Sequence, residues 1–449
     1  MIFTCLLTVE VNLKMMRDTD PISWENERGD NVPIQTLENY IREKLNTLPP
    51  SSDEPCIYRV PEILRRASES TYSPQLVSIG PFHRDNRSLG KMDVHKWKYL
   101  KTYLNRFHEI NLLSCLESLR ELEGRTRQCY AECINLSSNQ FLEMMLLDGV
   151  FIIMFLLKFY SPEIRENDPI INTMWMISAL QHDMILLENQ LPFFVLEHLF
   201  SLAPVSSQYS NFFDLAIDFI KDLVKQNTTL GTKIDRFEVK HILDLLRSYC
   251  IPSSSPRFNN EPYSRHSMTE LHDVGVKFKA GVSGSSFLLD VKFTNGVLEI
   301  QPLPIQDRTE SFFRNLIALE QCHYPKFAYV TGYALFMDYL INTPKDAGLL
   351  IDNEIIKNYL GSHEDVSAFI NNLSKDVVLD NTSTYFSKYY QGLDAYCKKR
   401  RHKWSTSLRR TYYGSPITII SSIAAGLLLG LTIIQAVCSL ISLKYAKKS

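Results

Sequence analysis

The residues best suited to chemistry in this sequence lie in the segment QHDMILLENQLPFFVLEHLF, residues 181–200. His182, Asp183 and Glu188 offer an imidazole and two carboxylates, the groups used in acid–base catalysis and in metal binding. Asp183 and Glu188 are five residues apart, about 140° around a helix, so they do not share a helical face. The metal-binding HExxH pattern is absent from the sequence. We therefore predict that Glu188 and the two polar residues after it end a buried helix and satisfy backbone groups.

Two further patterns resemble functional sites only in part. The stretch Gly281-Val-Ser-Gly-Ser-Ser fits neither GxSxG nor GxxxxGK[ST], and a turn before a strand explains it. Cys129 and Cys133 would share a helix face, but no second His or Cys pair follows at zinc-finger spacing. We therefore assign no catalytic residue, no metal site and no cofactor. The alternative is an enzyme with an active site assembled from distant residues, and the first to mutate would be His83, His182, Asp183 and Asp290.

The cysteines are scattered, odd in number and without a close-paired framework. Free thiols in a reducing compartment are the simplest explanation. The nine positions are Cys5, Cys56, Cys115, Cys129, Cys133, Cys250, Cys322, Cys397 and Cys438.

The composition is that of a folded globular chain, with 45% hydrophobic and 22% charged residues in a length of 449. The formal net charge of −2 gives no overall attraction to nucleic acid. Since no nucleic-acid-binding module is recognisable either, we predict no nucleic-acid partner.

Helices predominate among the elements that must position these residues. Apolar residues recur at helical spacing in residues 34–48, and a Pro- and Ser-containing break follows. Turns on either side of Leu76–Ile79 predict a short extended segment there. The apolar run Val150–Leu157 is too short to span a bilayer, so we predict a helix in the core.

The second half combines helices with a hairpin. HILDLLR at 241–247 closes a helix, and the polar, Pro/Ser-rich segment 251–267 is the best internal boundary. Phe287–Phe293 and Val297–Ile300 then flank Asn295-Gly296, a strong hairpin signal. From Thr309 we predict helices as far as Tyr396.

A run of 27 uncharged residues, Ile417 to Leu443, lies near the C-terminus. As a helix it would reach about 40 Å, more than the roughly 30 Å hydrocarbon core of a bilayer. Core helices usually carry a polar stripe, whereas the most polar residues here are Gln435 and several Ser and Thr. We therefore predict one transmembrane helix.

The fold class that we predict is mainly α (α+β), with a helical soluble body, a small β-hairpin element and this one C-terminal transmembrane helix. The predicted divisions are a loose leader (1–33), a helical lobe (34–250), a linker or long loop (251–267), an α+β lobe (268–397), a basic juxtamembrane segment (398–415), the transmembrane helix (416–443) and a basic tail (444–449).

Aromatic and basic residues flank the uncharged run. Tyr412 and Tyr413 before it, and Tyr445 after it, suit the headgroup layer. Seven cations precede the run and three follow it, and such cations are retained on the cytosolic side, so we expect a cytosolic body. Among membranes we favour the plasma membrane. The basic segment also resembles a nuclear-import signal or an RNA patch, but contact with lipid is our interpretation. The upstream cations are Lys398, Lys399, Arg400, Arg401, Lys403, Arg409 and Arg410.

Small residues recur within the predicted transmembrane helix. Gly426 and Gly430 form a small-xxx-small pattern, and Ser422 lies one turn earlier. Such a groove lets a second helix approach closely, which predicts homo-association. The alternative is that glycine is simply frequent in membrane spans.

Nine segments occur in the order seen in a large plant family: IYRVPEILRR, YSPQLVSIGPFH, LLDGVFIIMFL, DMILLENQLPFFVL, HILDLLR, ELHDVGVKF, DVKFTNGVLEI, RNLIALEQC and AAGLLLGLTIIQ. Over roughly residues 55–445 the chain resembles the plant domain of unknown function 247 family, also called uncharacterised protein family 0481. The resemblance implies a mostly helical soluble part, one C-terminal membrane helix and no established catalytic residues. Some relatives are linked to self-incompatibility and reproductive development, which implies recognition or signalling. We therefore expect a membrane-tethered interaction protein with the bilayer and an unknown protein as partners.

Overall fold

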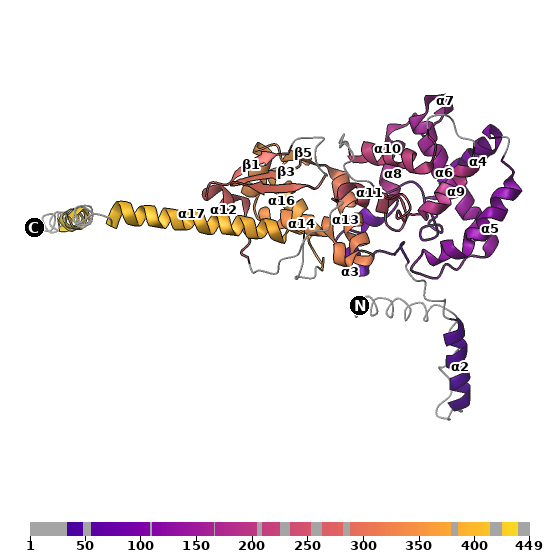
Figure 1. Cartoon of the computed structure of the whole chain (residues 1–449), viewed down its shortest axis with the longest axis horizontal. Coiled ribbons are helices and arrows are strands. Elements are labelled where there is room, and N and C mark those ends of the chain that lie inside the picture. The colour runs from indigo at the N-terminus through magenta and orange to yellow at the C-terminus, as the bar shows by residue number, and fades with distance from the viewer. Residues whose placement is uncertain are drawn as a thin grey trace, which may run out of the picture.

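Helices account for most of the computed structural model, which confirms the mainly helical class with small β elements. One cluster of buried apolar side chains runs from Cys56 to Cys397, so both halves of the body share a continuous core. Figure 1 shows this body with α17 projecting from one end. The structure describes residues 34–47, 55–107, 110–165, 167–203, 209–224, 234–252, 263–281, 288–378, 385–413 and 424–438.

Helix α6, Ser138–Tyr160, is the central helix of the first half. It begins at a capping box, in which the Ser137 hydroxyl accepts the N–H of Gln140 and the Gln140 side chain accepts the N–H of Ser137. From Phe141 to Lys158 it is buried apart from one glutamate, because neighbouring helices cover its faces. The predicted core helix is therefore confirmed. The neighbours are α4 (Asp93–Arg106), α5 (Leu112–Gln128), α7 (Pro162–Arg165), α9 (Phe193–Leu202) and α10 (Phe212–Val224).

Shorter helices complete the first half of the body around these. They are α3 (Glu62–Arg65), η1 (Glu69–Tyr72), η2 (Gly90–Met92), α8 (Met174–Asp183) and α11 (Ile242–Cys250).

The predicted hairpin is confirmed. Strands β2 (Val291–Thr294) and β3 (Val297–Ile300) pair antiparallel around Asn295 and Gly296. Both turn residues have positive φ, 51° and 79°, which is the backbone conformation that a tight two-residue hairpin turn requires. Strand β2 starts later than predicted, because residues 288–290 are not part of the strand.

Three short strands were not predicted. Strand β1 (Lys277–Ala280) pairs parallel with β3, and β4 (Leu303–Ile305) pairs parallel with β5 (Ile356–Asn358). The prediction of helices throughout from Thr309 to Tyr396 is therefore wrong at β5. A strand of three residues shows no periodicity along the chain, and its partner here is 53 residues away.

The remaining helices of the second half pack around these strands. They are α12 (Met268–Asp273), α13 (Asp307–Cys322), η3 (Pro325–Phe327), α14 (Tyr329–Leu340), α15 (Pro344–Asp352) and α16 (His363–Leu373).

Helix α17, Ser387–Tyr413, begins inside the body and then leaves it (Figure 1). Its first turns are held among aromatic rings. Phe386, just before the helix, stacks on Phe336 with ring centroids 5.3 Å apart, and Tyr390 stacks on Tyr263 at 5.0 Å. The helix continues without a break through the boundary predicted between residues 397 and 398.

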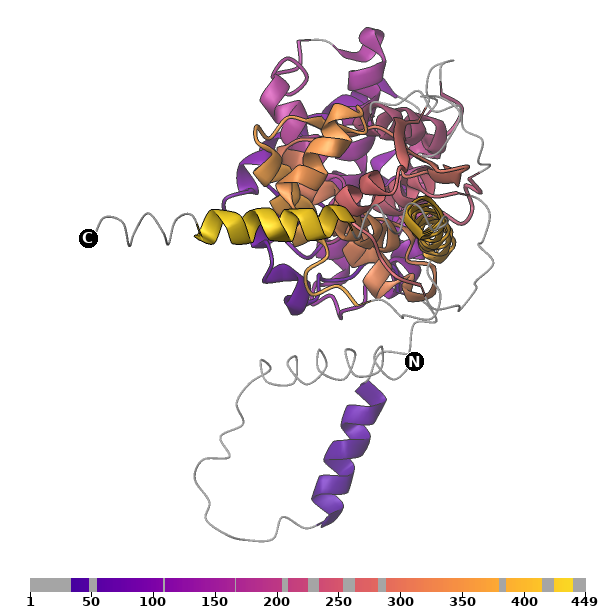
Figure 2. The same ribbon diagram turned by 90° about the vertical axis from the view of Figure 1, so that its left-hand side faces the viewer.

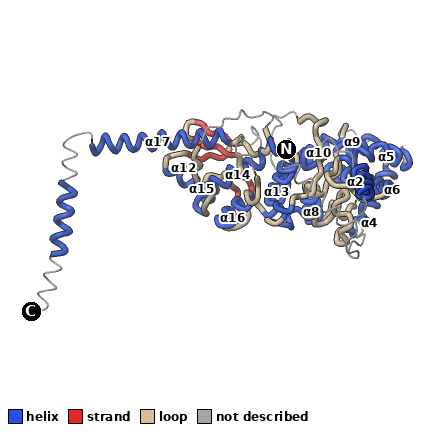
Figure 3. Tube along the Cα trace, turned by 90° about the horizontal axis from the view of Figure 1, so that it is seen from below, coloured by secondary structure: helices blue, strands red, loops and turns tan. Residues whose placement is uncertain are grey.

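Two further helices lie apart from the body. Helix α2, Ile34–Thr47, confirms the helix predicted from spacing, and Figures 1 and 2 both show it outside the main mass. Figure 3 shows the helix Ala424–Cys438 beyond the end of α17. This helix is the described part of the predicted transmembrane segment 416–443, whose other residues lie outside the described ranges.

Within the described part of the chain, one helix is both long and apolar enough to cross a membrane. It is α6, and the body buries most of it. Ala424–Cys438 is a shorter apolar helix. The predicted leader, the basic tail, most of the predicted linker, and residues 282–287 of the glycine-serine stretch lie outside the described residues.

Candidate functional site

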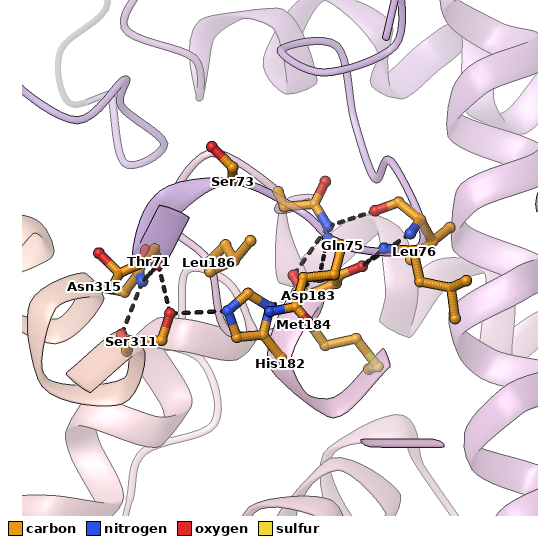
Figure 4. Close-up of polar contacts among 12 residues, drawn as sticks. Thr71, Ser73, Gln75, Leu76, His182, Asp183, Met184, Leu186, Ser311 and Asn315 are labelled. Carbon is orange, nitrogen blue, oxygen red and sulfur yellow. Dashed lines mark hydrogen bonds and ion pairs between the residues drawn. The ribbon is translucent and has the colours of Figure 1, made fainter. Parts of the chain in front are cut away.

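Residues 73–80, called the strap here, are buried or half-buried along most of their length and belong to none of the described sheets. Buried backbone N–H groups need partners, and side chains supply them here. Asp183, which is fully buried, accepts the N–H of Gln75 at 2.8 Å. Its other oxygen accepts the N–H groups of Leu76 and Val77 at 2.7 and 2.9 Å (Figure 4). One carboxylate therefore holds three consecutive backbone groups.

Two amide side chains extend this contact. Asn189 accepts the N–H of Ile79 at 2.7 Å and donates to the carbonyls of Val77 and Asp183. Gln190 donates to two carbonyls of its own loop and accepts an N–H at the start of α11. The prediction that these polar residues satisfy backbone groups is confirmed. The helix itself ends earlier than predicted, at Asp183.

A second buried carboxylate, Asp148 of α6, holds the end of the strap. One oxygen accepts the N–H of Gly80 at 2.8 Å, and the other lies 2.6 Å from Lys96 Nζ. The same ammonium group donates to the carbonyl of Ser78 at 2.6 Å. Burial raises the pKa of Asp148, and the positive charge of Lys96 opposes this effect.

Gly80 is required where the strap meets these partners. Its φ is +73°, and a Cβ atom at this position would lie 2.7 Å from the carbonyl oxygen of Gln190. Sequence reasoning missed the contribution of Asp148 and Lys96. The available signal was that Asp148 is the only charged residue between Glu143 and Lys158 of α6.

His182, Asp183 and Ser311 are connected in the order of a Ser-His-Asp catalytic triad. His182 Nδ1 lies 2.9 Å from Asp183 Oδ1, and His182 Nε2 lies 2.9 Å from Ser311 Oγ (Figure 4). The hydroxyl of Ser311 donates to the carbonyl of Thr71 at 2.5 Å. The hydroxyl proton of Ser311 therefore points to this backbone carbonyl, whereas in a working triad it is shared with the histidine.

Burial supports the same conclusion. The three triad-like residues are at most 5% exposed, so a substrate has no direct access to the Ser311 oxygen. Asn315, also on α13, donates to the carbonyl of Thr71 and accepts the N–H of Leu187. This cluster therefore joins η1, the loop after α8, and α13. Sequence reasoning missed Ser311 and Asn315, because polar residues on one face of a helix carry no sign of their distant partners.

Glu188 holds a different part of the backbone. Its Oε1 accepts the N–H of Val60 at 2.6 Å and pairs with Arg65, and its Oε2 lies 3.1 Å from His83 Nε2. Burial alone would raise its pKa, but His83, Arg65 and the Val60 N–H together lower it. The two acids of this segment therefore bind different groups, as their spacing predicts, and His83 lies with Glu188 and not with Asp183.

Asp290, the fourth residue of the enzyme alternative, lies just before β2 and forms an ion pair with Lys292 at 3.4 Å. The hydrogen bonds and ion pairs of the described residues do not join it to either histidine. Over these same ranges, no group of three or more His, Cys, Asp or Glu side chains could hold a metal ion.

The residues predicted to meet a membrane fall at the other end of the molecule. Lys398, Lys399 and Arg400 are exposed on α17. A Cβ atom at Gly426 or Gly430 would meet nothing within 4 Å, so the glycine face of that helix is open. Six further residues that we predicted to lie at the membrane surface belong to α17, and the structure describes only their backbone: Arg401, Lys403, Arg409, Arg410, Tyr412 and Tyr413. Ser422 and Tyr445 lie outside the described residues.

Comparison with known proteins identifies the family. The family model DUF247, plant protein of unknown function, matches residues 57–431. The chain belongs to this plant family. It is 30% identical to UPF0481 protein At3g47200 of Arabidopsis thaliana, over 94% of this chain and 91% of that protein. It is 23% identical to putative UPF0481 protein At3g02645 of the same plant, over 84% of this chain and 89% of that protein. No solved structure matches the chain.

The DUF247 match covers the strap, the polar loop after α8, and α13. It also reaches into the helix that carries the two glycines of the predicted transmembrane segment. Membership confirms the resemblance that the ordered motifs indicate.

Proposed function

We propose that this DUF247 protein is tethered to a membrane by its C-terminal helix and that its helical body is a protein-recognition module. The observation that carries the proposal is the exposure of the helix Ala424–Cys438. Its large aliphatic side chains are 48–66% exposed, and they are Leu427, Leu428, Leu429, Leu431, Ile433, Ile434 and Val437. Removing seven such side chains from water contributes on the order of 10 kcal/mol. A bilayer provides that environment.

The contrast with α6 supports this proposal. Both helices are apolar, and the body already buries α6. No comparable cover surrounds the described part of the last helix, and the uncharged run in the sequence extends beyond it at both ends. Packing inside the protein therefore explains why α6 is long and apolar. We propose that lipid surrounds the last helix instead.

The basic end of α17 fits a position beside anionic lipid. Each Lys or Arg near such a surface gains about 1 kcal/mol. From the excess of cations before the anchor we propose that the body faces the cytosol, and the plasma membrane is the membrane to examine first.

Glycosylation tests this orientation. The sequon residues Asn86, Asn135 and Asn372 are exposed on the body, so a lumenal or extracellular body would present them to the glycosylation machinery. We expect no change in mass on glycosidase treatment of the protein from plant cells. A glycosidase-sensitive mass shift would reverse the orientation.

We favour a recognition role over catalysis because the polar groups around Asp183, Asn189 and Ser311 already bind backbone groups of the protein. Its carboxylates and amides hold backbone groups, and the serine proton is donated to a carbonyl. We propose recognition or signalling, with reproduction and self-incompatibility as the processes to examine first. Proximity labelling with the tagged full chain in its own tissue is the experiment that would name the partner.

The enzyme alternative has one observation in its favour, the position of His182 between Asp183 and Ser311. A fluorophosphonate probe, which reacts with activated serines, separates the two functions. We expect no labelling of Ser311 in the full-length protein. Labelling that is lost in Ser311→Ala would support the enzyme.

Deletion of residues 417–443 tests the tether itself. We expect the shortened protein to leave the membrane fraction. Deletion of residues 34–47, which removes the exposed helix α2, is the control and should leave the protein in the membrane fraction. Retention of the first variant at the membrane would contradict the proposal, and its accumulation in the nucleus would favour the import interpretation of the basic segment.

A further inference from the structure

Cys56 and Cys129 are neighbours where the chain enters the body. An isolated parallel bridge pairs Ile57 with Tyr130, the residues directly after them. The N–H groups of Cys56 and Ile57 donate to the carbonyl of Cys129 at 2.8 and 2.9 Å. With standard bond lengths, the direct bond from the Cys56 N–H to the Cys129 carbonyl keeps the two Cα atoms within about 6.7 Å, inside the roughly 4.4–6.8 Å that disulfides span. The backbone is therefore placed for a disulfide, and both thiols are free.

The two thiols differ in acidity. A hydrogen bond between them raises the pKa of Cys56 and lowers the pKa of Cys129. Burial acts against ionisation of both, and the positive charges of Arg125 and Lys240 favour the Cys129 thiolate. Cys56 is only 3% exposed, whereas Cys129, at the end of α5, is partly exposed. The more acidic thiol is therefore also the more accessible one.

Three other cysteines of the described body lack this combination. Burial raises the pKa of Cys115 and Cys250, and it raises the pKa of Cys322 to about 12. Cys133 is exposed and lies only four residues after Cys129, which makes it a matched control for accessibility.

We propose that Cys129 and Cys56 form a reversible regulatory disulfide when the protein meets a peroxide. The Cys129 thiolate attacks one peroxide oxygen, the O–O bond breaks, and the other oxygen leaves as an alcohol or as water after taking a proton. Cys129 is then a sulfenic acid. The sulfur of Cys56 attacks it, the S–S bond forms, and hydroxide leaves with the Cys56 proton as water. Two thiols are oxidised by two electrons, and the peroxide is reduced.

The bond would fix the first residues of the body to the end of α5. In the reduced protein, no covalent bond fixes residues 55–60 there: hydrogen bonds such as that of the Val60 N–H to Glu188 hold them, together with the burial of Ile57 and Val60 in the core. The disulfide would therefore add a covalent link to these non-covalent contacts and make separation of the segment from the body harder. A thiol reductant restores the free pair.

Mass spectrometry of the full-length protein in detergent tests the proposal without any variant. The protein is treated with one equivalent of hydrogen peroxide, alkylated and digested. We expect a cross-linked peptide that joins Cys56 to Cys129, lighter by two hydrogens and cleaved by dithiothreitol. We also expect Cys129 to be consumed about ten-fold faster than Cys133, because its thiolate is stabilised.

Variants assign the order of attack. In Cys56→Ser the sulfenic acid at Cys129 should persist and react with dimedone, whereas Cys133→Ser should pair as the wild type does. The proposal is overturned if wild-type Cys129 is trapped by dimedone while Cys56 remains open to alkylation. A disulfide between Cys129 and Cys133, or equal consumption of these two thiols, would also overturn it.

Discussion

Replacing Asp183 with Asn tests whether its carboxylate holds the strap. The carboxylate accepts three backbone N–H groups and contacts His182 at 2.9 Å. An Asn side chain has one acceptor oxygen. If that oxygen stays with Leu76 and Val77, the amide N–H group faces the N–H of Gln75, and both are donors. Hydrogen bonds to a charged group contribute about 1.5–3 kcal/mol each, and breaking a buried charged contact costs about 3–5 kcal/mol.

We therefore expect Asp183→Asn to lower the free energy of unfolding by about 3–5 kcal/mol. Urea unfolding of the full-length protein in one detergent, followed by tryptophan fluorescence, measures this difference from the shift in midpoint and the slope. The matched control is Asp85→Asn, the same chemical change at an exposed position, which should stay within about 0.5 kcal/mol of the wild type. If the free energy of unfolding of Asp183→Asn is also within about 1 kcal/mol of the wild-type value, the carboxylate does not hold the strap and the reasoning is wrong.

Three further predictions concern His241, Gly80 and the two glycines of the last helix. Burial lowers the pKa of His241 to about 4, while its pKa in the unfolded chain is about 6.5. The unfolded chain therefore binds the proton first as pH falls. This contribution to stability is complete above about pH 6.5, falls toward pH 4, and is lower by about 2 kcal/mol at pH 5. His241→Asn, which keeps a cap acceptor, should remove that loss when urea midpoints at pH 7.5 and pH 5 are compared. Gly80→Ala should lower the free energy of unfolding by at least about 2 kcal/mol in the same assay, because Gly80 has a positive φ and a Cβ atom there has no room. The control Gly124→Ala, in open space on α5, should leave the free energy of unfolding unchanged or raise it slightly. Equal effects of the two substitutions would contradict this account. Replacing Gly426 and Gly430 with Ile should reduce energy transfer between labelled copies in vesicles, and unchanged transfer would remove the proposed helix pairing.

Local signals in the sequence predict the local structure well. The Asn295-Gly296 turn requires two residues with positive φ, and Asn and Gly adopt positive φ readily, so these two residues predict the hairpin. The long apolar run of α6 predicts a buried helix because a sufficiently apolar helix needs cover on every face. The polar residues after α8 likewise indicate that backbone groups nearby need hydrogen-bond partners, but they do not indicate which backbone groups these are.

Long-range partners could not be predicted from the same signals. Ser311 contacts His182 and Thr71, which are 129 and 240 residues away in the chain. Strand β5 pairs with a strand 53 residues earlier, and its three residues carry no pattern. Such contacts depend on how the helices pack in three dimensions, which the period of a single element does not encode.

The tether is the central claim, and alkaline extraction tests it most directly. Membranes from cells that make the intact, tagged protein are washed with sodium carbonate at high pH, which strips peripheral proteins but leaves spanning helices in the bilayer. We expect the protein to remain in the membrane pellet, to float with lipid in a density gradient, and to be released by detergent. Recovery of the intact protein in the carbonate supernatant would contradict the account.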